Sequence, residues 1–409
     1  MTVFKDSPIL KGHTVGFALY DVDQKLSLCE YNADKYFTAA SNTKLFSFYI
    51  GLKILKDSIP GLRYVEREDS LIFWGTGDPS LLHPILEGSN VLDLLRVAPQ
   101  KLYYAAGNYT GKFYGHGWMY EDYNTGFQPE KSELPLFGNV VNVFTNSAGE
   151  LQITPVYFKK YIQKDETYTP FRFKIERKIF TNEFTYPSAL FPPNFKQQIP
   201  WRTTPELTTA LLEEQLGKTV SIISMPLPSD ANTIYSVKSD SLYKEILQKS
   251  DNFLAEQLLI VCASTRFDTL STENIISYAN QEFLQDLPDP TLWFDGSGIS
   301  RYNLFTPRTL VALLGRIKEE MKDQERLYGL FPAGGISGTI KKLYPTDGDN
   351  AFVWAKTGTV KNNYNQSGYL LTKKGKNLIF SFMNNNYSRP SSEVRKEVAR
   401  IITYIHKNF

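Results

Sequence analysis

Strand-like segments at both ends of the chain constrain its fold more than any other feature of the sequence. Two short apolar runs near the amino end are separated by a polar turn at residues 21–24, which is typical of a hairpin. Three similar runs near the carboxyl end alternate with turns that contain asparagine and glycine. We therefore predict a five-stranded, mainly antiparallel sheet to which both ends contribute. Its strands occupy residues 14–20, 25–31, 351–357, 366–372 and 377–383.

Two helix-like segments belong beside this sheet. Residues 391–407 carry one apolar stripe with charges on the other faces, which is typical of a helix that covers a sheet. Residues 44–55 are apolar almost all round, which is typical of a helix buried inside a domain. The sequence therefore predicts an α/β sandwich.

The middle of the chain differs in character from its ends. A chain of 409 residues is too long for a single compact core. Prolines, glycines and aromatic residues recur between about residues 63 and 232, and alternating runs such as 171–180 favour strands. We predict a discontinuous domain of residues 1–65 and 233–409, interrupted by a β-rich inserted region at residues 66–232.

Composition excludes several classes of protein. Lysine and arginine number 45 and aspartate and glutamate 43, so the net charge of +2 predicts no nucleic-acid partner. The two cysteines and four histidines are scattered, so we predict neither a metal site nor a cofactor. Apolar runs are too short for a transmembrane segment. The first ten residues lack the pattern of a signal peptide, so the protein is either cytoplasmic or has had such a peptide removed.

Ser41 and Lys44 form the first motif with chemical meaning. A Ser-x-x-Lys spacing at the start of a helix puts both side chains on one face. A lysine that is desolvated there can take the proton of the serine hydroxyl and so activate it as a nucleophile. The spacing alone is weak evidence, because Ser241 and Lys244 match it too and Ser41 could simply cap the helix.

Two further motifs follow in the order that this chemistry needs. Ser250-Asp251-Asn252 falls between two helix-like runs, where capping is the bland alternative. Lys356-Thr357-Gly358-Thr359 ends a predicted strand, and a Lys-Thr-Gly tripeptide is expected by chance only about 0.1 times in this length. The three motifs thus lie at a helix start, an inter-helix loop and a strand edge.

This set of motifs resembles the penicillin-binding proteins and serine β-lactamases. Four further segments resemble the class C low-molecular-mass penicillin-binding proteins, the D-alanyl-D-alanine carboxypeptidases and endopeptidases. The separation of 209 positions between Ser41 and Ser250 fits their large insertion, whereas Thr76 and Ser80 depart from their commoner residues. The segments are residues 74–81, Gly117-Trp118 with Asp122, residues 295–303 and residues 338–340.

The resemblance implies a penicillin-binding/β-lactamase-like sandwich whose discontinuous domain is transpeptidase-like and catalytic. It implies a serine D-Ala-D-Ala carboxypeptidase, with endopeptidase action as an additional activity left open, that acts on peptidoglycan stem peptides and is acylated by β-lactam antibiotics. It also implies an exported, periplasmic or cell-envelope protein. Two alternatives are a serine β-lactamase or esterase, and a penicillin-binding sensor domain without turnover.

The same resemblance implies a role for each motif residue. Ser41 is the nucleophile, Lys44 its base and Ser250 a proton donor to the leaving group, while Asn252 binds the substrate amide. Lys356, Thr357, Gly358 and Thr359 bind the terminal carboxylate, and the backbone N–H groups of Ser41 and Thr359 form the oxyanion hole.

Two segments outside the motifs have a bland and a functional interpretation. The loop at 295–303 is typical of a turn in which Asp295 and Ser297 satisfy the backbone, but Arg301 suits a carboxylate on the substrate's side chain, such as that of diaminopimelate. The aromatic stretch 114–123 is more typical of core than of a cleft wall, so we predict core.

Overall fold

A five-stranded antiparallel sheet joins the two ends of the chain in the computed structural model, which describes residues 6–86, 88–346 and 348–409. Its strand order is β16-β17-β18-β1-β2, so the amino-terminal hairpin lies against the last strand of the chain. The register pairs Thr14 with Asn385 and Asp21 with Leu378. The predicted sheet is confirmed, with strands β1 (Thr14–Asp21), β2 (Leu26–Tyr31), β16 (Val353–Val360), β17 (Asn363–Leu371) and β18 (Asn377–Asn385).

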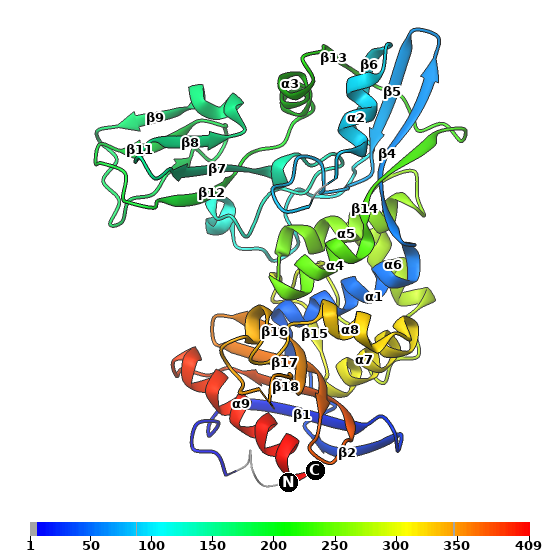
Figure 1. Cartoon of the computed structure of the whole chain (residues 1–409), viewed down its shortest axis with the longest axis vertical. Helices are drawn as coiled ribbons and strands as arrows, with labels where there is room; N and C mark the ends of the chain where they lie inside the picture. The colour runs from blue at the N-terminus through cyan, green and yellow to red at the C-terminus, as the bar shows by residue number, and fades with distance from the viewer. Residues whose placement is uncertain (1–5, 87, 347) are drawn as a thin grey trace.

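Helices cover both faces of this sheet, as Figure 1 shows. On one face lies α9 (Ser391–Asn408), whose apolar stripe packs against Phe17, Phe380 and Phe382. On the other face α7 (Pro307–Met321) contacts β1 and β18, and α1 (Lys44–Ile54) packs between α7 and α5 (Asn252–Ser264). Residues 44–51 of α1 are all buried, which agrees with their apolar surround.

Short elements complete the helical side of the lobe that contains the β16-β17-β18-β1-β2 sheet. Strand β3 pairs with β15 in a two-stranded sheet, and the 3₁₀ turn η1 connects β3 to α1. These elements are β3 (Phe37–Thr38), η1 (Ala40–Thr43), α4 (Ser239–Gln248), α6 (Thr272–Glu282), β15 (Leu304–Phe305), α8 (Gln324–Leu330) and η5 (Gly338–Ile340).

A second five-stranded sheet, in the order β13-β6-β5-β4-β14, forms the inserted region next to these helices. Its strands β4 and β14 pair directly, so residues 58–65 and 233–238 share this sheet. The predicted boundaries at 65 and 233 therefore cut through β4 and β14, and the division into domains stays a prediction. The elements are β4 (Ser58–Arg67), β5 (Ser70–Gly75), α2 (Asn90–Val97), β6 (Lys101–Ala105), α3 (Pro205–Leu216), β13 (Val220–Ile223) and β14 (Asn232–Lys238).

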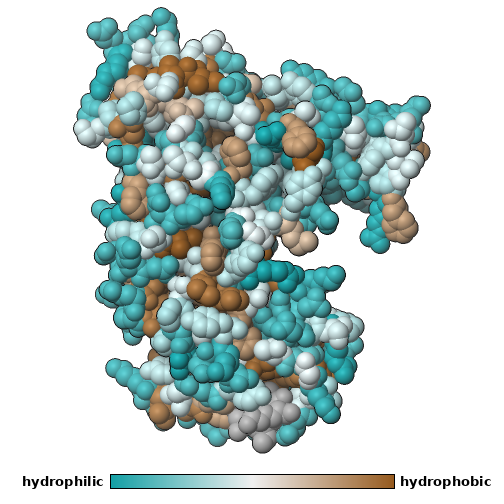
Figure 2. Space-filling view, turned by 180° about the vertical axis from the view of Figure 1, so that it is seen from behind, coloured by the Kyte–Doolittle hydropathy of each residue, from teal (hydrophilic) through white to brown (hydrophobic). Residues whose placement is uncertain are grey.

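Two small sheets form an arm that projects from the insert. The space-filling view shows an open notch between this arm and the lobe that contains the β16-β17-β18-β1-β2 sheet (Figure 2). The predicted strand at 171–180 is wrong, because β10 covers only Glu176–Arg177 of it. The arm and the segments leading to it contain η2 (Tyr120–Asn124), η3 (Phe137–Asn139), β7 (Val140–Thr145), β8 (Leu151–Thr154), η4 (Val156–Tyr161), β9 (Ile162–Asp165), β10 (Glu176–Arg177), β11 (Phe184–Pro187) and β12 (Lys196–Pro200).

Helices of the described residues are all too short or too polar to cross a membrane.

Candidate active site

Ser41 lies in the turn that connects the sheet to the buried helix. The sequence places Ser41 at the start of the helix, but α1 begins at Lys44 and Ser41 belongs to the preceding 3₁₀ turn. The correction is small, since Lys44 Nζ still lies 3.0 Å from Ser41 Oγ. Ser41 is half-buried and lines a cavity of about 280 Å³ together with Ser250 and Thr359. The Ser41 hydroxyl therefore lies next to a possible base, Lys44, and faces a cavity that can hold a ligand.

Lys44 is fully buried and is held by three hydrogen bonds. Its Nζ donates to Ser41 Oγ, to Asn252 Oδ1 at 2.7 Å and to the Ser297 carbonyl at 2.6 Å. Burial lowers the pKa of Lys44 from 10.5 to about 8, against the opposing charges of Asp295, Asp251 and Glu256. A substantial fraction of Lys44 is therefore neutral near pH 8 and able to accept a proton from Ser41.

Ser250 and Lys356 form a second serine–lysine pair on the opposite wall. Lys356 Nζ donates to Ser250 Oγ at 2.7 Å and to the Thr357 carbonyl at 2.8 Å. Burial, together with the charge of Lys44, holds the pKa of Lys356 well below its usual range. Ser250 has a φ of +60°, a strained conformation that aims its side chain from the loop between α4 and α5. Two hydroxyls thus face one cavity, each beside a buried amine.

Asn252 connects the two halves of the site. It is the first residue of α5, where Asp251 caps the helix by accepting from Leu254 N at 2.9 Å. Asn252 Oδ1 accepts from Lys44, while Nδ2 donates to the Phe127 carbonyl at 3.1 Å. Phe127 belongs to the inserted region, and no motif indicated that this region braces Asn252. Among the described residues no group accepts the second hydrogen on Nδ2, which can therefore bind a ligand.

Gly358 lets strand β16 approach the nucleophile turn. A Cβ at this position would lie 2.4 Å from the Ala39 carbonyl oxygen and 3.1 Å from Ser41 N. Glycine is therefore required by close approach rather than by backbone conformation. The next residue, Thr359, is exposed to the cavity, whereas Thr357 Oγ1 donates to Thr339 Oγ1 at 2.9 Å.

The loop at 295–303 positions Lys44 through its backbone. Asp295 accepts from Gly298 N and Ser300 N, each at 2.7 Å, and this fixes the Ser297 carbonyl that Lys44 donates to. The expected turn is therefore present. Arg301 points away from this network: it is exposed, and its Nη2 donates to the Lys361 carbonyl at 3.4 Å.

A buried carboxylate near Lys44, that of Glu256, belongs to none of the three motifs. Glu256 Oε1 accepts from Ser297 N at 2.7 Å, and Glu256 Oε2 lies 3.9 Å from Lys131 Nζ. Burial and the nearby charge of Asp295 raise the pKa of Glu256 to about 6. Glu256 lies within a helix that is otherwise largely apolar, and a charged residue in such a run is the sequence signal that could have indicated a buried functional carboxylate.

The aromatic stretch at 114–123 is not core, so that prediction is wrong. Its residues are half-buried or exposed, and Tyr120 is 70% exposed. Trp118 Nε1 donates to Asp295 Oδ2 at 2.9 Å, which ties the stretch to the loop beneath Lys44. The stretch stays outside the core because the polar ends of its rings face partners or solvent.

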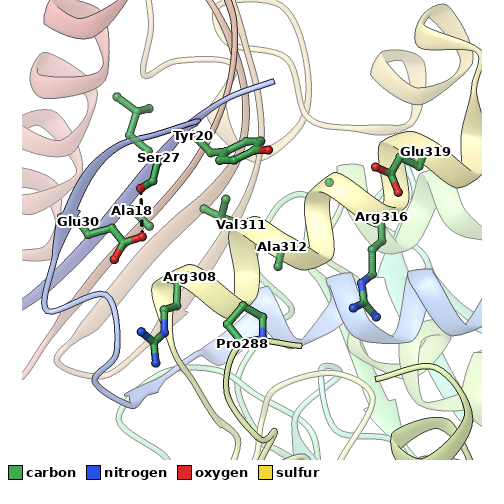
Figure 3. Close-up of a pocket in the computed structure, with 12 residues that line it drawn as sticks. Ala18, Tyr20, Ser27, Glu30, Pro288, Arg308, Val311, Ala312, Arg316 and Glu319 are labelled. Atoms are coloured by element: carbon green, nitrogen blue, oxygen red, sulfur yellow. Dashed lines mark hydrogen bonds between the residues drawn. The ribbon is translucent and has the colours of Figure 1, made fainter. Parts of the chain in front are cut away.

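Two other cavities differ in their relation to Ser41. One of about 970 Å³ extends from Ser250 and Asn252 to Lys196 and Asn142 of the arm. Another, of about 540 Å³, lies between β1, β2 and α7 (Figure 3). Its wall carries Tyr20 and Val311 beside a Ser27–Glu30 hydrogen bond of 3.0 Å, without any motif residue.

The sandwich and its three motifs define the class of penicillin-binding proteins and serine β-lactamases. The chain belongs to the D-Ala-D-Ala carboxypeptidase 3 (S13) family, whose model matches residues 2–405.

Individual relatives agree with this assignment. The chain is 24% identical to the D-alanyl-D-alanine carboxypeptidase DacB of Haemophilus influenzae, over 96% of this chain and 90% of that protein. It superposes on the crystal structure of penicillin-binding protein 4 (DacB) from the same organism with a TM-score of 0.77 and 20% identity, covering 99% of this chain and 98% of that one. A predatory peptidoglycan endopeptidase of Bdellovibrio bacteriovorus shares the fold, with a TM-score of 0.53, 14% identity and coverage of 96% and 93%.

Proposed function

We propose that this protein is a serine D-Ala-D-Ala carboxypeptidase that cleaves peptidoglycan stem peptides through an acyl-enzyme. The observation that carries the proposal is the 3.0 Å approach of Lys44 Nζ, fully buried and with a pKa near 8, to Ser41 Oγ. Family membership supports the substrate, and the cell-wall location of that substrate supports an exported protein.

Acylation begins when Ser41 Oγ attacks the carbonyl carbon of the penultimate D-alanine. The Oγ proton passes to neutral Lys44, and the oxyanion is stabilised by the backbone N–H groups of Ser41 and Thr359. Gly358 allows these two N–H groups to face the same point, because it removes the side chain between β16 and Ser41.

The leaving D-alanine needs a proton on its nitrogen as the amide C–N bond breaks. Ser250 is placed to donate it, and the proton that Lys44 took from Ser41 replaces it on Ser250, with Lys356 holding the Ser250 hydroxyl in place, so that Lys44 is neutral again. Water then enters, gives its proton to Lys44 and attacks the ester, and Ser41 leaves with that proton. The two serine–lysine pairs thus do the work of a histidine.

The cavity of about 970 Å³ favours endopeptidase action as a second activity. It begins at Ser250 and Asn252 and continues to Lys196 of the arm, and Lys249 adds a further cation. A cross-linked peptide carries a second acidic stem, and the two lysines of this cleft outnumber its one carboxylate, Asp251, which favours such a chain.

One set of assays tests the proposal. Diacetyl-lysyl-D-alanyl-D-alanine should release D-alanine, a chromogenic cephalosporin should be hydrolysed slowly if at all, and labelled penicillin should map to Ser41. Fast cephalosporin turnover would indicate a β-lactamase, and acylation without peptide cleavage a sensor. Label on Ser241, whose Ser-x-x-Lys spacing lies within α4, would refute the assignment of the nucleophile.

A further inference from the structure

Arg395 of the carboxyl-terminal helix lines the same cavity as Ser41. The helix α9 covers the sheet, and its Arg395 also lies with Ser250, Thr357 and Thr359 around a space of about 280 Å³. Its guanidinium is 5.4 Å from the centre of the Tyr364 ring, which supports the side chain from below. The cavity therefore has a permanently charged cation on its wall.

The hydrogen-bonding capacity of Arg395 is largely unused. Its Nη2 donates to Thr359 Oγ1 at 3.4 Å, a long contact, and its Nε is buried without a hydrogen-bond partner among the described residues. Arg400, on the same helix, pairs with Glu397 at 2.8 Å. In the part of the chain that the structure describes, no such carboxylate pairs with Arg395. Burying a donor without an acceptor is costly, so an acceptor is expected from outside the chain.

Lys356 is poorly suited to the carboxylate role that the resemblance gives it. It is fully buried, and its Nζ already donates to Ser250 Oγ and to the Thr357 carbonyl. Burial and Lys44 lower its pKa well below the usual range, which favours a neutral amine with both hydrogens engaged. Thr357 Oγ1 is also occupied, by Thr339. A substrate carboxylate must find its positive charge elsewhere.

We propose that Arg395, together with the hydroxyl of Thr359, binds the terminal carboxylate of the residue that the enzyme releases. Thr359 follows Gly358, where an added Cβ would lie 3.1 Å from Ser41 N, and Thr359 and Arg395 line the same cavity as Ser41, so the pair lies beside the nucleophile. A guanidinium presents two parallel N–H groups and stays charged at all working pH values, which suits a carboxylate. The proposal deepens the proposed function and depends on it.

The test compares substrates with and without the carboxylate. We would measure kcat/KM for diacetyl-lysyl-D-alanyl-D-alanine and for its carboxamide, with wild type, Arg395→Gln and Arg395→Lys. We expect Arg395→Gln to lower kcat/KM for the acid by about 10- to 150-fold, the range for hydrogen bonds to charged groups, and to leave the amide nearly unchanged. Arg395→Lys should recover part of the loss. Lys396→Gln removes an exposed cation from the same helix and should behave as wild type.

Acylation gives an independent readout. Benzylpenicillin and its methyl ester, followed by mass spectrometry, should show the same selective loss in Arg395→Gln, and labelling by the ester reports that the variant is folded. Equal losses with acid and neutral partners, or an unchanged preference for the acid, would overturn the proposal. If Arg395→Gln does not fold, an Arg395→Lys variant with wild-type preference for the acid supports a role for charge, and one with equal losses on both refutes it. Failure of wild type to be acylated or to cleave would instead refute the proposed function.

Discussion

The pH dependence of acylation tests the role of Lys44. Lys44 must be neutral to accept the proton of Ser41, and its pKa of about 8 makes roughly half of it neutral at pH 8, about a tenth at pH 7 and about a hundredth at pH 6. The second-order rate constant for acylation by benzylpenicillin should therefore fall about 50-fold from pH 8 to pH 6. Above pH 9 it should reach a plateau.

The charges around Lys44 refine this expectation. Glu256 has a pKa of about 6 and its negative charge raises the pKa of Lys44, so protonation of Glu256 should make the fall in rate shallower below pH 6. Stopped-flow measurement of acylation between pH 5.5 and 9.5 gives the profile, and circular dichroism at each pH verifies that the protein stays folded. A rate that is flat from pH 6 to 8, or a midpoint near 10.5, would refute Lys44 as a base of lowered pKa.

Three further results are expected. Lys44→Met should abolish acylation. Lys44 is charged in both states below pH 8 and neutral in both above pH 10.5, so wild type should gain up to about 3 kcal/mol of stability relative to Lys44→Met as pH rises through this range, which urea unfolding at pH 7 and pH 10 would measure. Gly358→Ala should slow acylation at least 10-fold with a smaller change in melting temperature, because its Cβ would meet Ala39 and Ser41; near-normal rates would contradict the close approach. Arg301→Ala should lower kcat/KM for a diaminopimelate-type peptide by roughly 1.5 to 3 kcal/mol and spare an acetyl-lysyl peptide, whereas equal losses would mean that Arg301 only braces the loop.

Much of the fold was predictable because its signals are local. The five strands alternate or run apolar between turn residues, and each such segment forms a strand within a few residues of its predicted ends. The three motifs were likewise visible as short stretches of sequence. In the structure Ser41 and Ser250 line one cavity, and each is hydrogen-bonded to a buried lysine, Lys44 or Lys356.

The remaining parts depend on tertiary placement. A charged residue beside the apolar stripe of a helix is expected to face solvent, so the sequence predicts the same position for Arg395 and Lys396. Only the structure shows that Arg395 lies over the Tyr364 ring. Asn252 donates to the backbone carbonyl of Phe127, which any residue at position 127 would provide, so the sequence gives no signal for this contact. The aromatic composition of residues 114–123 predicts core, but in the structure this stretch lies at the surface beside the loop at 295–303.

The pairing of β1 with β18 affects how the protein is made. During synthesis the amino-terminal hairpin exists long before residues 377–385, which complete its side of the sheet. At about 5 to 20 residues per second, some 360 residues take about 20 to 70 s to appear. Throughout that time the edge of β1 that pairs with β18 lacks its native partner and is open to wrong ones. Because β16 also arrives late, the nascent chain carries Ser41 without the strand that completes its cavity and stays inert until synthesis is nearly finished.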